Sequence, residues 1–143
     1  MATVKALFME YANTLGFDLS FQNFNTELAE LPGEYSEPSG CILIARIDSA
    51  IVGCVALRDL GSMVCEMKRL YVQPAFRGEG VGRQLAKSII AEARSRGYRE
   101  MKLDTVASMN QAIQLYNSLG FKQTAPYRHN PIQGAVFMQL ELV

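Results

Sequence analysis

The chain has 143 residues, 49% of them apolar, and its 14 basic and 14 acidic residues cancel. This length and apolar share favour a single domain over residues 1–143 with its own core. The zero net charge gives no field to attract nucleic acid or an anionic membrane. No apolar run approaches the roughly 20 residues that cross a bilayer, and no signal peptide begins the chain, so we expect a cytoplasmic protein.

The amino-terminal part is predicted to be helical. Apolar residues recur at helical spacing from Thr3, which can cap a helix, to Leu15. A second helix is expected from Phe21 to Leu31, where a Pro-Gly pair stops it. Residues 31–40 are rich in Pro, Gly and Ser and are predicted to be a loop.

The rest of the chain alternates strands with helices, which predicts one mixed α/β domain. Two apolar runs joined by Asp48-Ser49-Ala50 indicate a hairpin. The expected strands are 41–47, 51–57, 63–72, 101–106 and 136–142. The expected helices are 80–96 and 110–119, each followed by a glycine that suits a left-handed cap.

The cysteines are three in number, Cys41, Cys54 and Cys65, and they lack C-x-x-C spacing. That pattern indicates neither a disulfide framework nor a zinc site. All three fall in expected strands, so we interpret them as buried structural thiols and expect no metal.

A glycine-rich loop joins the expected strand 63–72 to the helix 80–96. It reads Arg77-Gly78-Glu79-Gly80-Val81-Gly82-Arg83. Free backbone N–H groups at a helix N-terminus bind phosphate, so this loop is a candidate phosphate cradle. A dinucleotide-binding loop needs a third glycine where Arg83 stands, and no Gly-Lys-Ser or Gly-Lys-Thr occurs, so both nucleotide interpretations are weak.

The spacing Arg77-x-x-Gly80-x-Gly82 resembles the acyl-CoA signature of the GNAT superfamily of N-acetyltransferases, Q/R-x-x-G-x-G/A. Residues 110–121, Asn-Gln-Ala-Ile-Gln-Leu-Tyr-Asn-Ser-Leu-Gly-Phe, are similar to the family segment N-x-x-A-x-x-L-Y-x-x-x-G-F. Two motifs in this order, one helix and one strand apart, make the resemblance specific. It covers residues 41–143 well and the first forty only loosely.

The resemblance implies the GNAT fold, an α/β fold with a single mixed central sheet flanked by helices. That fold usually starts with a strand before its first helix, and the pattern here starts in the helix. The first strand is therefore missing, or its place is taken by something else, such as a partner subunit. A homodimer is for this reason a possible assembly.

The resemblance also implies that acetyl-CoA binds along the loop and the strand before it. The loop backbone would hold the pyrophosphate, with Arg77 and Arg83 adding charge-assisted contacts. Strand residues would offer main-chain groups to the pantetheine arm. The alternatives are a solvated charge for Arg83 and a helix N-cap for Asn110. The candidate cofactor-binding residues are Leu70, Tyr71, Val72, Arg77, Gly78, Glu79, Gly80, Val81, Gly82, Arg83 and Asn110.

Two side chains are candidates for proton transfer. Glu66 precedes Arg77 by eleven residues, the interval at which some GNAT enzymes place a catalytic glutamate, and partial burial would raise its pKa toward neutrality. The alternative is a structural carboxylate paired with Lys68 or another cation. Tyr116 matches the family tyrosine that faces the sulfur of coenzyme A, and its pKa near 10 keeps it protonated. Its alternative is ordinary ring packing.

The expected reaction is acetyl transfer from acetyl-CoA to a primary amine, by direct attack in a ternary complex. Residues 21–35 and 127–134 would shape the acceptor pocket, and basic side chains there would favour an acceptor with a carboxylate. The candidates are Arg58, Arg69, Arg128 and His129. The alternatives are a non-catalytic acyl-CoA-binding module, a protein lysine or N-terminal acetyltransferase and, more distantly, a nicotinamide site. The neutral net charge argues against a polyamine or aminoglycoside enzyme.

Overall fold

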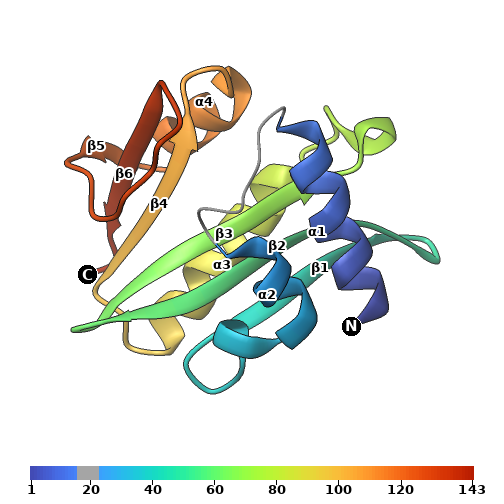
Figure 1. Ribbon diagram of the computed structural model, residues 1–143, viewed down its shortest axis with the longest axis horizontal. Helices are drawn as coiled ribbons and strands as arrows, with labels where there is room; N and C mark the ends of the chain where they lie inside the picture. Colours follow the sequence, from blue (N-terminus) through green and yellow to red (C-terminus); the bar gives the residue numbers. More distant parts are fainter. Residues whose placement is uncertain (16–22) are drawn as a thin grey trace.

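A computed structural model of the protein describes residues 1–15 and 23–143. One mixed sheet of six strands, in the order β1-β2-β3-β4-β6-β5, runs through it (Figure 1). The strands are β1 Cys41–Ile47, β2 Ala50–Gly61, β3 Val64–Val72, β4 Glu100–Val106, β5 Lys122–Thr124 and β6 Ala135–Glu141. The helices are α1 Ala2–Thr14, α2 Phe24–Glu30, α3 Val81–Ser95 and α4 Asn110–Ser118, with short 3-10 turns at Gly33–Tyr35 and Pro74–Phe76. The predicted α/β fold with a mixed central sheet flanked by helices is confirmed.

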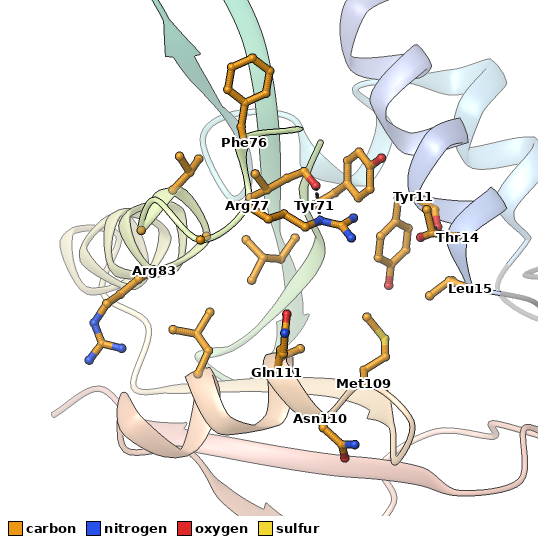
Figure 2. A pocket seen from close by; sticks show the side chains of 18 of the residues that line it. Tyr11, Thr14, Leu15, Tyr71, Phe76, Arg77, Arg83, Met109, Asn110 and Gln111 are labelled. Atoms are coloured by element: carbon orange, nitrogen blue, oxygen red, sulfur yellow. Dashed lines mark hydrogen bonds between the residues drawn. The ribbon is translucent and has the colours of Figure 1, made fainter. Parts of the chain in front are cut away.

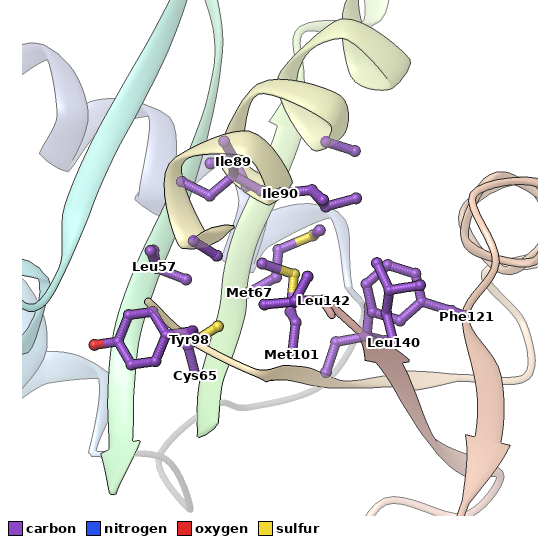
Figure 3. Close-up of a cluster of buried hydrophobic side chains, with 14 of the residues drawn as sticks. Leu57, Cys65, Met67, Ile89, Ile90, Tyr98, Met101, Phe121, Leu140 and Leu142 are labelled. Carbon is purple, nitrogen blue, oxygen red and sulfur yellow. The ribbon is translucent and has the colours of Figure 1, made fainter. Parts of the chain in front are cut away.

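Helices cover both faces of the sheet. In Figure 1, α1 and α2 lie in front of β1 to β3 and α3 lies behind them. Leu85, Ile89 and Ala93 of α3 recur every fourth residue and pack into a core that includes Met67 and Met101 (Figure 3). A second core lies between α1, α2 and the front face. The three cysteines are buried free thiols, as predicted.

The first helix differs from the prediction at its start. It begins at Ala2, with Met1 as the N-cap and no side-chain capping bond, so Thr3 lies inside the helix and does not cap it. The helix α2 begins at Phe24, after the N-cap Asn23, and not at the predicted Phe21, and it ends at Glu30, one residue before the predicted Leu31. The first two residues of that predicted helix, 21 and 22, lie outside the described residues. In the described residues the first strand is β1, which follows α1 and α2 along the chain and forms one edge of the sheet.

The strand β2 is longer than its apolar run predicts. It continues to Gly61 because its polar end pairs with the start of β3, with Arg58 opposite Glu66. Ser62 and Met63 both have positive φ and form the two-residue turn between the strands. The expected strand start at Met63 is therefore wrong by one residue. The short strand β5 was not predicted, because its three polar residues carry no apolar alternation.

The strands β3 and β4 are parallel neighbours that pair over only three residues. The pairing joins Val64–Glu66 to Glu100–Lys102, and beyond it β3 and β4 have no paired residues, whereas β4 pairs with β6 along its whole length. A small cavity of about 60 Å³ lies between β3, β4 and the start of α4. We call it the junction cavity; Lys68, Leu70, Asp104, Met109 and Tyr116 are among its lining residues.

A β-bulge interrupts β3 at Arg69, which has φ of 59°. Ahead of it, Met67 packs in the core beneath α3, whereas beyond it Tyr71 packs in the core beneath α1 and α2. One inserted residue therefore shifts the alternation of the strand. As a result, Lys68 and Arg69 are both available to the face that α1 and α2 cover, although they are consecutive in the sequence.

Candidate active site

The glycine loop opens onto empty space at the start of α3. Gly78 and Gly80 have φ of 84° and 82°, which accounts for glycine at both positions. A Cβ built at either glycine would have no atom of the described residues within 4 Å. Gly80 is the N-cap of α3 and makes no side-chain capping bond. No side chain therefore caps the first N–H groups of α3, and the space beside them is open. An anion-binding site at a helix N-terminus requires both features.

A long cleft of about 790 Å³ starts at this loop. It runs past the end of β3 to the start of α4 and the last turn of α1 (Figure 2). Predicted cofactor-binding residues on its walls are Leu70, Tyr71, Val72, Arg77, Gly78, Gly80, Val81, Gly82, Arg83 and Asn110. The structure thus brings ten of the eleven predicted positions together in one cleft.

The two arginines of the loop have protein partners. Arg77 crosses the cleft, where its Nε donates to the carbonyl oxygen of Val72 at 2.8 Å and its guanidinium lies over the ring of Tyr71 (Figure 2). Arg83 donates to Ser118 Oγ at 2.8 Å and so ties α3 to α4. Both side chains therefore shape the walls of the cleft.

Two other predicted residues are placed differently from the expectation. The side chain of Glu79 lines a separate cavity between β1 and α3 and not the long cleft. Asn110 is the first residue of α4, after the N-cap Met109, so the capping alternative is not found. Figure 2 shows Gln111 rising into the cleft while the amide of Asn110 points the opposite way. Sequence reasoning missed Gln111, because the helix start alone does not reveal which side chain faces the cleft.

Tyr116 lies in the wall of the junction cavity. Its side chain is held by a ring contact with Phe121, with centroids 5.7 Å apart, and only 8% of the residue is exposed. Burial raises the pKa of Tyr116 further above its ordinary value of 10.0. The hydroxyl is therefore protonated at neutral pH.

Glu66 is fully buried, with 0% exposure, and its carboxylate is shared. Arg58 Nε donates to it at 2.6 Å and the Tyr127 hydroxyl at 2.5 Å, and the Arg128 guanidinium also donates to it. Burial alone would raise the pKa of Glu66, but the charges of Lys68, Arg58 and Arg128 outweigh it and the pKa lies below its ordinary value. The predicted rise of this pKa is wrong, because the partners are cations. At neutral pH Glu66 is an ionised anchor for two arginines.

Lys68 was predicted only as a possible ion-pair partner of Glu66, and its side chain lies between two cavities. It is 6% exposed and lines the junction cavity on one side and a second cavity on the other. Burial and the neighbouring charge of Arg69 lower the pKa of Lys68 to about 7. A substantial fraction of Lys68 is therefore a neutral amine at physiological pH. Simple strand alternation does not predict the bulge at Arg69, and so it does not predict how the side chains on either side of it are placed.

The second cavity, of about 200 Å³, lies between α2, the turn Gly33–Tyr35 and the front face of the sheet. We call it the arginine cavity; Arg58, Lys68, Arg128, Glu27, Glu34 and Tyr35 line it. Two of the four predicted basic residues are therefore present. Arg69 instead binds Glu27 of α2 through Nε and NH2 at 2.9 and 2.8 Å. His129 is exposed and lines neither this cavity nor the junction cavity.

Two features are absent from the described residues, 1–15 and 23–143. No helix within these ranges is long and apolar enough to cross a membrane. Within the same ranges, no group of three or more His, Cys, Asp or Glu side chains is arranged to hold a metal ion.

Comparison with known proteins agrees with this geometry. The model of the acetyltransferase (GNAT) family matches residues 5–121. An uncharacterized N-acetyltransferase of Schizosaccharomyces pombe is 46% identical over 140 residues, which cover 96% of this chain and 86% of that protein.

Two solved structures extend the comparison. A GNAT acetyltransferase of Staphylococcus aureus has the same fold, with a TM-score of 0.82 at 18% identity, over 99% of this chain and 94% of that one. The putative acetyltransferase yncA of Salmonella typhimurium, solved with its cofactor acetyl-CoA, has a TM-score of 0.66 at 27% identity, over 83% of this chain and 73% of that one. The family match, the relative and the shared fold together show that this chain belongs to the GNAT acetyltransferase family.

Proposed function

We propose that the protein transfers an acetyl group from acetyl-CoA to a primary amine of a small molecule, by direct attack in a ternary complex. One observation carries the proposal. The cleft that begins at the uncapped start of α3 shares Leu70 and Met109 with the junction cavity, where Tyr116 and Lys68 are both found. The groups that we assign to anion binding and to proton transfer would therefore line neighbouring cavities with shared walls.

The shape of the long cleft fits acetyl-CoA. The N–H groups of the glycine loop would bind the pyrophosphate, since no atom of the described residues blocks the open side of Gly78 or Gly80. Backbone groups of Leu70 to Val72 would pair with the pantetheine amides, as in the addition of a strand. When bound, acetyl-CoA supplies an activated acetyl thioester. The Salmonella protein solved with acetyl-CoA supports this choice of donor.

Two side chains would move the protons. Lys68, as the neutral amine, would accept a proton from the attacking acceptor nitrogen, and Tyr116 would donate one to the departing sulfur. The new bond joins nitrogen to the acetyl carbon, and the bond from that carbon to sulfur breaks. An amine and a thioester thus become an amide and a thiol, with proton transfer through solvent restoring both side chains.

In this proposal Glu66 is a positioning residue and not the base. Its carboxylate is enclosed by Arg58, Arg128 and Tyr127 and is ionised well below neutral pH. A base needs an accessible lone pair and a pKa near the working pH. We therefore assign Glu66 to positioning the two guanidinium groups, and Lys68 to the proton transfer.

A binding experiment on the glycine loop tests the proposal. Gly80→Asp places bulk and negative charge beside the N–H groups of α3, so CoA and acetyl-CoA binding measured by calorimetry should be lost. Gly61→Asp is the matched control, because Gly61 also has positive φ and open space but lies in the β2–β3 turn region. Unimpaired CoA binding by a folded Gly80→Asp protein would contradict the site.

Turnover separates this proposal from its alternatives. A non-catalytic acyl-CoA-binding module would bind acetyl-CoA and release no CoA with any amine. A protein acetyltransferase would acetylate proteins in a lysate and no free small amine. The enclosed arginine cavity, at about 200 Å³, favours a small acceptor over a protein side chain presented on a broad surface. Cytoplasmic localisation and a homodimer stay predictions.

A further inference from the structure

We propose that the arginine cavity binds a carboxylate of the acceptor, so that the substrate is a small amine that also carries a carboxylate, such as an amino acid. The inference rests on the proposed function and narrows it to a class of acceptor. Two observations support it: an unsatisfied donor on Arg128, and the position of Lys68 in the walls of both cavities.

Guanidinium groups of Arg58 and Arg128 line the cavity beside glutamates of α2 and the turn after it. Arg58 binds both Glu66 and Glu34, whose side chain is 70% exposed. Among the described residues, Arg128 forms an ion pair with Glu66 alone, and it shares that carboxylate with Arg58. Arg128 is therefore the guanidinium group that a carboxylate of a ligand would complement.

Arg128 carries a buried donor whose hydrogen no described residue accepts. Its terminal nitrogen binds Glu66, but its Nε is buried and has no hydrogen-bond partner among the described residues. An unmet buried donor is destabilising, and more so when it belongs to a charged group. A carboxylate is the acceptor that a guanidinium binds best, because its two oxygens match the planar array of donors.

The position of the cavity suits an acceptor of this kind. Lys68 lines both the arginine cavity and the junction cavity, so it stands where the two meet. A ligand whose carboxylate binds Arg128 would direct an amine a few bonds away toward Lys68 and Tyr116. The volume of about 200 Å³ is below the usual size of a pocket for a drug-sized ligand, which favours a small metabolite.

Paired acceptors test the inference with the wild-type protein. Each L-amino acid is compared with its own α-carboxamide, with acetyl-CoA saturating and CoA release as the readout. The amide keeps the amine and side chain and loses only the charge, so kcat/KM should fall by roughly 10- to 100-fold, as loss of a charged hydrogen bond predicts. The α-amine of the carboxamide is less basic than that of the amino acid, so more of it is neutral and able to attack. This difference alone would favour turnover of the carboxamide, the opposite of the result that we expect.

A variant links the preference to the cavity. Arg128→Gln should raise KM for the favoured amino acid about tenfold or more, leave acetyl-CoA affinity unchanged and bring the acid-to-amide ratio toward one. Arg99→Gln removes the same charge at an exposed residue that lines none of the cavities described, and should change none of these quantities. If Arg128→Gln does not fold, the ratio of kcat/KM between each amino acid and its carboxamide, measured on the wild-type protein, still tests carboxylate recognition.

The outcomes separate the two levels of the proposal. Equal turnover of acids and amides, or turnover only of amines without a carboxylate, would refute carboxylate recognition and leave acetyl transfer standing. Acetyl-CoA binding with no turnover of any acid would refute it as well. Failure to bind acetyl-CoA at all would instead refute the proposed function.

Discussion

The substitution Lys68→Met tests the proposed proton acceptor through folding stability as well as through activity. In the folded protein the pKa of Lys68 falls from 10.5 to about 7, chiefly through burial and the charge of Arg69, with Arg128 adding to the fall and Glu66 and Asp104 opposing it. In the unfolded chain the lysine returns to its ordinary pKa. Folding near pH 7–10 therefore releases a proton from Lys68, which costs free energy.

The sign and size of the effect follow from this difference in pKa. Between pH 7 and about 10 the unfolded state binds the extra proton, so stability rises with pH by up to about 1.4 kcal/mol per pH unit. The variant Lys68→Met lacks this term and should be the more stable protein at pH 7. Its advantage should shrink by roughly 2 kcal/mol between pH 7 and pH 9. Urea unfolding of both proteins at each pH measures it, and all other titrations cancel in the comparison.

Activity gives the second readout of Lys68. A base with a pKa of about 7 predicts a limb below that pKa on which wild-type kcat/KM loses a further factor of about ten per pH unit. Lys68→Met should lose about 10²- to 10⁴-fold in kcat/KM, the usual contribution of a general base, and should lose this limb of the profile. Lys87→Met, at an exposed position of α3, is the control and should keep the wild-type rate and profile.

Two results would refute the role of Lys68. A stability difference between wild type and Lys68→Met that does not change with pH would mean that the lysine is charged in the folded protein. A limb near pH 7 that survives in the variant would mean that another group accepts the proton. The limb from the acceptor amine itself lies at higher pH, near the pKa of an alkyl amine, and does not obscure this comparison.

The remaining predictions concern Glu66 and Tyr116. Glu66→Gln should cost about 3–5 kcal/mol in urea unfolding, because it leaves Arg58 and Arg128 without their buried anion, whereas Glu34→Gln at an exposed position should cost under about 1 kcal/mol. Because the pKa of Glu66 is lowered on folding, its contribution to the free energy of unfolding is complete above its ordinary pKa of 4.5 and is lost as pH falls through the folded pKa. The wild-type protein should therefore unfold at a lower pH than Glu66→Gln in an acid titration, and an equal or higher midpoint would contradict this. Tyr116→Phe should lower kcat and leave acetyl-CoA affinity nearly unchanged, and equal turnover by both proteins would remove the tyrosine from the mechanism.

Local sequence patterns were sufficient for most of the architecture and for the anion-binding part of the site. Strand alternation and helical spacing depend on neighbouring residues, so β1, β4, β6, α3 and α4 are placed within a residue or two of their predicted ends. The loop from Arg77 to Gly82 was recognisable because glycine at positive φ is a local backbone requirement. Elements without a local signature, such as the polar strand β5, were missed.

The chemistry of the acceptor side depends on contacts that no local pattern contains. Glu66 binds Arg128, 62 residues away in the sequence, so the sequence could not reveal that the pKa of this carboxyl is lowered and not raised. Lys68 became a candidate base only once the structure showed the bulge at Arg69 and the burial beneath α2. The sequence by itself determined most of the secondary structure through local periodicity, and its two motifs carried the resemblance to the GNAT family, which implies the acetyl-CoA site. The tertiary structure decided which charges share one buried space, because burial and long-range pairing set their pKa values.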